Sequence, residues 1–204
     1  MNIYHVESVK GMTQSLSGRV FTPYDAAYAN IADYPWGCAY RPEARAWVAA
    51  DGERLIVTLC ANEPTIAARE RAFGGAVCVD SCLEFFVNPC PRAGDVYLNI
   101  EVNLLGTMHI GAGASRDGRR VLDEMPGGVD CSVSRHEGGW WAVRYHLPYR
   151  LLEALAGAPV ERVMRANFYT CDESIHPHFG VWNHVAAAQP DFHRPECFGR
   201  LEFA

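Results

Sequence analysis

Apolar and polar residues alternate with a period of two along most of the chain. Successive side chains of a β-strand point to opposite faces, so this period indicates strands. Turn signals such as Asp51-Gly52 and Gly138-Gly139 separate the alternating runs. Because no regular series of helices intervenes, the pattern predicts an all-β fold, a two-sheet antiparallel β-sandwich of about nine or ten strands. The predicted strands lie within residues 44–50, 53–60, 77–87, 95–111, 129–137, 140–148 and 163–171.

Two short segments carry helical signals. Residues 148–155 (PYRLLEAL) begin with proline and are followed by Gly157, and residues 64–73 (PTIAARERAF) also begin with proline. Proline at the start and glycine after the end are typical of a helix. We therefore expect one or two short helices beside the sandwich. Residues 172–198 have little periodicity, which predicts one long loop.

One side of each predicted strand is apolar and should pack between the sheets. In residues 96–103 (VYLNIEVN), for example, Leu98 and Ile100 share the apolar side. The predicted core residues are Trp47, Leu55, Val57, Leu83, Phe85, Leu98, Ile100, Val143 and Phe168.

Composition narrows the class of protein. The 204 residues suit one domain, residues 1–204, and the net charge of -6 argues against a nucleic-acid partner, which would require a basic stripe. No apolar run approaches the roughly 20 residues that span a bilayer, and no charged-then-apolar leader opens the chain, so we expect a soluble, cytoplasmic protein. The eight cysteines mostly lie in apolar runs, which favours reduced core thiols, with disulfides or a zinc site as alternatives.

The other side of the predicted strands carries polar and aromatic side chains. Such a face is either a solvated surface or a platform for a sugar, whose hydroxyls need Asn, Glu and Arg and whose ring stacks on aromatics. The chain is rich in asparagine and aromatic residues but has a single lysine, Lys10, which favours the sugar platform. The strand residues offered to a ligand are Glu84, Asn99, Glu101, Asn103, Arg144, Asn167 and Tyr169.

Four blocks of sequence suggest a family. In chain order they are VDSCLEFFVNP, VYLNIEVNLLGTMHIG, MRANFYTCDE and VWNHVAAAQPDFHRPECFGRLEF. In this order and near these spacings they resemble carbohydrate-binding module family 9-like domains, over residues 40–203. The resemblance implies a β-sandwich that binds a mono- or oligosaccharide without catalysis, alone or beside a separate glycoside hydrolase partner, and that serves carbohydrate catabolism.

The resemblance also implies site residues. Glu84 in DSCLEFF looks like a hydrogen-bonding acid of the family's site. The best-known members hold a terminal sugar between two tryptophans, and this sequence has Cys78 and Phe192 near those positions. Trp36, Trp182 or His193 would then supply a different stacking surface.

The block DFHRPECFG (191–199) resembles the family's last loop, beside the sugar site. We expect Phe192 and His193 to point toward the face that holds Glu84 and Asn103, with Trp182 as a wall of the same cavity. Pro195 and Gly199 should fix the path of the loop, and a surface ion pair would account for Arg194 and Glu196.

Other functions stay open. Glu84 and Glu101 are the one carboxylate pair that we would nominate for glycoside hydrolysis. A structural or interaction module that has lost sugar binding is a further alternative. No cofactor is required, although calcium near Asp172 and Glu173 is an open possibility as a structural ion. Zinc would have weaker candidates, since their spacing matches no usual zinc pattern: His176, His178, His184, His193, Cys171 and Cys197.

Overall fold

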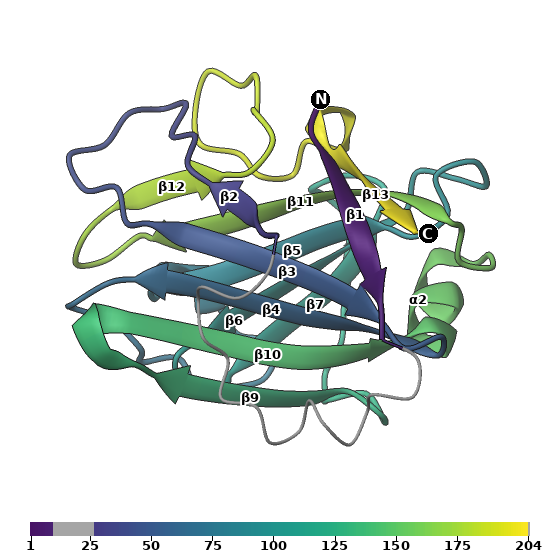
Figure 1. Cartoon of the computed structure of the whole chain (residues 1–204), viewed down its shortest axis with the longest axis horizontal. Coiled ribbons are helices and arrows are strands. Elements are labelled where there is room, and N and C mark those ends of the chain that lie inside the picture. The colour runs from purple at the N-terminus through teal and green to yellow at the C-terminus, as the bar shows by residue number, and fades with distance from the viewer. Residues whose placement is uncertain (10–26, 204) are drawn as a thin grey trace.

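Two layers of strands face each other in the computed structural model, which describes residues 1–9 and 27–203 (Figure 1). The first sheet has the strand order β8-β7-β6-β5-β11-β13, with β12 also paired to β11, and the second has the order β3-β4-β10-β9, with β2 paired to β3. The strands are β1 (Ile3–Ser8), β2 (Ala29–Ile31), β3 (Ala44–Ala50), β4 (Arg54–Asn62), β5 (Cys82–Asn88), β6 (Tyr97–Asn103), β7 (Met108–Gly113), β8 (Arg120–Val121), β9 (Asp130–Arg135), β10 (Trp140–Pro148), β11 (Val163–Asp172), β12 (His178–Val181) and β13 (Gly199–Phe203).

Strand β1 belongs to both sheets. Residues 3–6 pair with β13, and Glu7 and Ser8 pair with β3. Both pairings are parallel, whereas the other strand pairs are antiparallel. The predicted sandwich is therefore confirmed, with β1 as a parallel link between its layers.

The predicted strands agree well with the observed ones. Residues 44–50 and 140–148 match β3 and β10 residue for residue. Residues 95–111 form a hairpin of two strands, β6 and β7, and residues 77–87 begin with a 3-10 turn, η1 (Val77–Val79), before β5. The described residues hold thirteen strands instead of nine or ten, because β1, β2, β8 and β12 are short or lie where loops were expected.

The helix predicted at 148–155 is confirmed as α2 (Tyr149–Ala156), which lies at one end of the sandwich (Figure 1). Pro148 precedes it, and Gly157 ends it in the left-handed conformation, with φ of 79°. Leu152 points into the core and is fully buried.

The helix predicted at 64–73 is wrong. Backbone N–H groups in this segment donate to side chains instead of to carbonyls of the preceding turn. Ala67 N donates to Ser81 Oγ (3.0 Å), and Arg69 N and Glu70 N donate to Asp80 Oδ2 (2.8 and 2.9 Å). These bonds satisfy the backbone without helix, so the tertiary contacts override the local helical signal.

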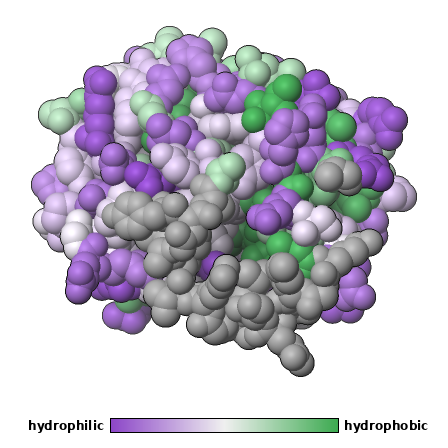
Figure 2. All heavy atoms as spheres, viewed as in Figure 1, coloured by the Kyte–Doolittle hydropathy of each residue, from purple (hydrophilic) through white to green (hydrophobic). Residues whose placement is uncertain are grey.

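The core lies between the two sheets and contains the predicted residues except Trp47. Ala46 and Val48 face the core from β3, so Trp47 points to the other side of its sheet, where it is buried against Cys60 and Trp140. All eight cysteines lie in the described residues and are free thiols. Figure 2 shows polar residues over much of one face of the molecule, with apolar residues gathered right of its centre. Among the helices that the structure describes, none has the length and apolarity of a bilayer crossing.

Candidate functional site

A pocket of about 90 Å³ opens on the outer side of the first sheet, between the strands β5, β6 and β11 and the segment that follows β12. The strand side of the pocket consists of Glu84, Phe86, Glu101 and Cys171, and Cys78 precedes β5. The opposite side consists of Phe179 from β12 and of loop residues Arg116, Glu173, Pro190, Asp191, Phe192 and His193. Two larger hollows, of about 220 and 580 Å³, lie beside Tyr149, at the end of the sandwich near α2.

Register places two carboxyl groups side by side at the bottom of the pocket. Glu84 on β5 is directly opposite Glu101 on β6, and Phe86 is opposite Asn99. Because side chains alternate, the intervening residues such as Phe85 face the core. Both glutamates are buried, so the polar face that the sequence predicts is here covered and not solvated.

Burial governs the electrostatics of this carboxyl pair. The pKa of Glu84 is raised well above its usual value by burial and by the neighbouring charge of Glu101. Its Oε1 atom accepts a hydrogen bond from the Cys171 thiol (3.1 Å). Burial also raises the pKa of Glu101, although His109 and the amide of Asn99, which donates to Glu101 Oε1 (2.7 Å), oppose that rise. The pair therefore favours bound protons over two negative charges.

A half-buried guanidinium supports the same strand. Arg119 Nη2 donates to Asn99 Oδ1 (2.7 Å), and the guanidinium carbon lies 4.2 Å from the centre of the Tyr97 ring. Asn99 thus links Arg119 to Glu101. The sequence gives no signal for Arg119, because it follows a turn and its partners come from the middle of β6.

The closing loop is tied down by Asp191. Its carboxylate accepts hydrogen bonds from Arg116 Nη1 (3.1 Å) and from the backbone N–H of His193 (3.1 Å), and it pairs with Arg194 (2.8 Å). Arg194 also lies 3.7 Å from Glu196. The surface ion pairs that the sequence suggests for Arg194 are therefore present.

Phe192 and His193 both line the pocket with Glu84, as the sequence analysis expects. The Phe192 ring stacks on Tyr169, with ring centres 4.1 Å apart, and Tyr169 Oη donates to the Phe192 carbonyl (3.1 Å). Tyr169 thus positions the loop from below. His193 packs on Phe86 at 4.9 Å, and its Nδ1 atom lies 3.0 Å from Tyr97 Oη. Burial and the nearby arginines lower the pKa of His193 to about 4, so the ring is neutral at pH 7.

Four residues expected at the site lie elsewhere. Trp182 belongs to the core between the sheets and packs on Phe168 at 5.3 Å, so it does not wall the pocket. Arg144 is on β10 of the second sheet, where its Nε donates to Thr58 Oγ1 (3.0 Å). Strand parity relates residues within one sheet and cannot show which sheet a strand joins.

The other two are structural asparagines. Asn103 fastens the β6–β7 turn, because its Oδ1 accepts from the N–H groups of Leu105 and Thr107 (3.0 and 3.1 Å). Asn167 donates to the Asn183 carbonyl and accepts from the Asn183 N–H group (2.9 and 2.8 Å). Their amide groups are thus occupied by partners within the fold, which for Asn103 include the Asp80 carboxylate (2.8 Å).

The pocket also contains residues that the sequence analysis did not nominate. Phe179 is on β12, in a segment expected to be a loop, and the alternation of apolar Phe179 and Val181 with His178 and Gly180 was the available sequence signal. Trp36 does not line the pocket. Its Nε1 atom donates to the Ala187 carbonyl (2.8 Å), and its ring supports Phe179 from behind at 6.3 Å.

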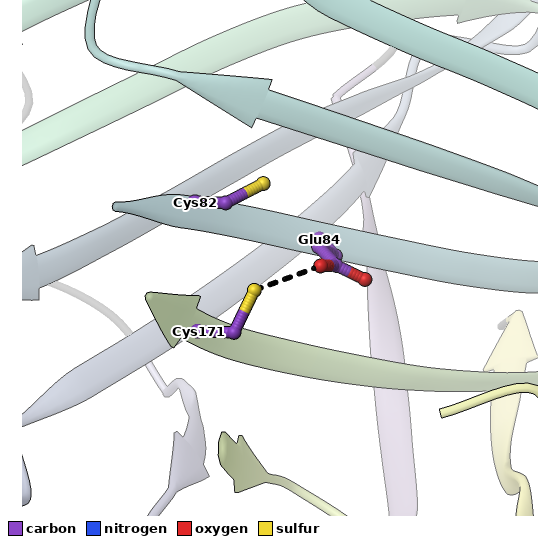
Figure 3. Close-up of side chains that lie close together, drawn as sticks. All are labelled: Cys82, Glu84 and Cys171. Carbon is purple, nitrogen blue, oxygen red and sulfur yellow. Dashed lines mark hydrogen bonds between the residues drawn. The ribbon is translucent and has the colours of Figure 1, made fainter. Parts of the chain in front are cut away.

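The histidines of residues 172–198 are not gathered. His178 is buried and lies 3.6 Å from Glu63, whereas His184 pairs with Asp33 (2.7 Å) at the surface. Asp172 accepts hydrogen bonds from Ser81 Oγ (2.8 Å) and from two N–H groups of its own turn, while Glu173 lines the pocket. In the described part of the chain, a different group has ligand spacing: Cys82, Glu84 and Cys171, whose ligand atoms lie within 4.8 Å of one another (Figure 3).

Several proteins of known structure have a fold similar to that of this chain. A candidate carbohydrate-binding protein of Bacteroides uniformis has 24% identity and a TM-score of 0.83, with 100% of this chain and 99% of that chain covered. A carbohydrate-binding module of family 9 from Caldicellulosiruptor kristjanssonii, solved with glucose, has 10% identity and a TM-score of 0.61, with 100% and 96% covered. A family 9 module from the same organism, solved with cellotriose, has 10% identity and a TM-score of 0.65, with 99% of this chain and 93% of that chain covered.

These likenesses to solved structures show a shared fold. Among curated proteins, none is significantly similar to this chain in sequence. The model of carbohydrate-binding family 9, however, matches residues 22–203, nearly the whole sequence. This chain therefore belongs to carbohydrate-binding family 9.

Proposed function

We propose that the pocket at Glu84 binds the end of a neutral saccharide without cleaving it. The observation that carries the proposal is the pairing of buried carboxyl groups with half-buried aromatic rings in one pocket of a family 9 chain. Glu84 and Glu101 supply hydrogen-bonding oxygens for hydroxyls, while Phe179 and Phe192 supply apolar surface for a sugar ring. The solved family 9 modules that hold glucose and cellotriose support the same class of ligand.

The size of the pocket limits the ligand. At about 90 Å³ it is well below the roughly 300 Å³ and upward of cavities that enclose a drug-sized molecule. The pocket therefore suits the edge of one terminal sugar residue. It does not suit a residue in the middle of a saccharide chain. We further infer a role in carbohydrate catabolism, beside a separate glycoside hydrolase.

Titration calorimetry against a panel of mono- and oligosaccharides, with glucose and cellotriose included, tests the proposal. We expect Phe192→Ala to weaken binding about threefold to tenfold through lost stacking area. Glu84→Gln should weaken it by about tenfold, because an amide cannot offer a sugar hydroxyl the same donor and acceptor pattern as the carboxyl group.

Matched controls exist for both variants. Phe203→Ala removes a half-buried ring of β13 outside this pocket, and Glu63→Gln changes a buried carboxyl outside it, so neither should alter binding. Absence of binding across the panel would overturn the proposal in favour of a structural or interaction module. Hydrolysis of aryl glycosides that is lost in both Glu84→Gln and Glu101→Gln would show a glycosidase instead.

A further inference from the structure

Three metal-ligating side chains meet below the saccharide pocket. Cys82 and Cys171 are directly opposite each other on the antiparallel strands β5 and β11. Glu84 is two residues beyond Cys82 and therefore projects from the same face of β5. Figure 3 shows the Cys171 thiol hydrogen-bonded to one carboxyl oxygen of Glu84 across the space between β5 and β11, with the Cys82 thiol also on β5, near Glu84.

The spacing of these ligand atoms suits one ion. The two sulfurs and a carboxyl oxygen lie within 4.8 Å of one another. A tetrahedral zinc ion with ordinary Zn–S bonds of about 2.3 Å would hold two sulfurs about 3.8 Å apart, so small side-chain rotations close the shell.

The burial of this group favours a cation. Cys82, Glu84 and Cys171 are 0%, 2% and 1% exposed. No cationic side chain forms an ion pair with Glu84 in the described residues, and its hydrogen-bond donor is a thiol. Two thiols and a carboxyl group in such a buried position can avoid unpaired negative charge in two ways. They can keep their protons, or they can lose them and bind a metal ion as anions.

We propose that Cys82, Glu84 and Cys171 form a binding site for a borderline-soft divalent cation, Zn²⁺ above all. Two thiolates and one carboxylate are a ligand set that zinc accepts and that calcium and magnesium do not. Three protein ligands leave a fourth position for water. Glu84 and Cys171 line the pocket, which provides the entry path and places that fourth position toward it.

The proposed metal site and the saccharide pocket share Glu84 but otherwise use different side chains. In Figure 3 the second carboxyl oxygen of Glu84 points away from both thiols, so it remains available to a hydroxyl group when the first oxygen holds the metal. The metal site does not depend on saccharide binding, since two of its three ligands are thiols. Metal binding releases the protons of both thiols and the proton that Glu84 holds in the metal-free fold.

The full chain, purified under reducing conditions without an affinity tag and stripped with a chelator, should be titrated with Co²⁺ and Zn²⁺. We expect about one metal ion per chain, with a cobalt–thiolate charge-transfer band that Zn²⁺ abolishes. The double variant with Cys82→Ser and Cys171→Ser should lose the band. Cys60→Ser, which changes a buried thiol of the second sheet, should retain it.

A second measurement needs no variant. Transient local opening exposes these buried thiols, and Zn²⁺ should slow the resulting alkylation of Cys82 and Cys171 in the wild-type chain, as mapped by mass spectrometry, while Cys60 keeps its own rate. Absence of a thiolate band in the wild type, or zinc protection that does not fall on these two cysteines, would overturn the proposal. A Cys82–Cys171 disulfide in a chain whose reduced form binds no cobalt would overturn it too. Saccharide calorimetry on the double variant separates the two proposals, because binding should persist there.

Discussion

At the scale of single residues, the pocket buries ionisable groups, and burial favours their neutral forms. Glu84 accepts a hydrogen bond from a thiol, and His193 lies near two arginines without becoming charged. Both groups are therefore neutral in the fold under conditions where the unfolded chain would charge them. Such differences make the free energy of unfolding depend on pH.

Glu84→Gln should change that pH dependence in the metal-free protein. The raised pKa of Glu84 means that the folded state binds its proton more tightly than the unfolded state does. This contribution to stability is present below the unfolded pKa of about 4.3 and is lost as pH rises through the folded pKa. We expect the variant to gain stability relative to the wild type as pH rises above about 4.3, measured by urea denaturation. Glu137→Gln, at an exposed position, should run parallel to the wild type.

His193→Gln should have the opposite effect on the acid side. Because the pKa of His193 is lowered to about 4, the unfolded chain, with a histidine pKa of about 6.5, takes up this proton first. The stability that the neutral ring contributes is present above about pH 6.5 and is lost as pH falls toward about 4. The variant should lose less stability than the wild type over this window in the same denaturation assay. Equal slopes would contradict the prediction.

At the scale of elements, β13 fits against the core through its first residue. Gly199 lies so close to Trp182 that an added Cβ would stand 2.5 Å from the indole ring and 2.9 Å from the Asn2 carbonyl. From the sequence, this glycine was expected to fix the path of the loop through its backbone freedom. Its φ is not in the left-handed region, however, and the structure requires glycine here for close packing.

Gly199→Ala should therefore destabilise the fold. Overpacking of this kind costs about 1–3 kcal/mol, because the indole and the strand must move apart. Gly94→Ala is the matched control, since nothing lies within 4 Å of its Cβ position and it should be neutral or slightly stabilising. Chemical denaturation of both variants measures the difference, and an unchanged midpoint for Gly199→Ala would contradict the prediction.

Individual strands and helices also show how far the fold and the pocket can be predicted from the sequence. Alternation in β6 placed Ile100 in the core and Glu101 in the pocket, because one period of two covers both faces. Proline and glycine located α2, since its ends are local. The helix expected at 64–73 failed because Asp80 and Ser81 bind its backbone from a distance. Arg119 and Trp182 could not be placed, because their surroundings depend on which segments the fold brings together.

At the scale of the whole molecule, β1 holds the two layers together along one side. It pairs with β13 of the first sheet and with β3 of the second. Asn2 adds hydrogen bonds to the Trp182 carbonyl and to Asn183 Oδ1, both of 2.7 Å. Without β1, the backbone edges of β13 and β3 would face solvent.

Deletion of residues 1–8 should lower the free energy of unfolding and promote self-association through these edges. Size-exclusion chromatography over a range of concentrations measures the association, and His5→Ala, at an exposed position of β1, is the control that keeps the backbone pairing. A deletion variant that stays monomeric and as stable as the wild type would show that β1 is dispensable.

The sharing of β1 between the sheets has a consequence for how the chain is made. Its partner β13 is the last described strand of the sandwich in chain order, so β1 is translated before the other described strands and waits for β13. At about 5–20 residues per second, synthesis of the intervening chain takes roughly 10–40 s. During that interval β1 lacks its β13 neighbour, and apolar residues of both layers are incompletely covered. Folding of the sandwich is therefore completed after translation of β13 and depends on sequence-distant pairing, which is slow to form and exposed to aggregation.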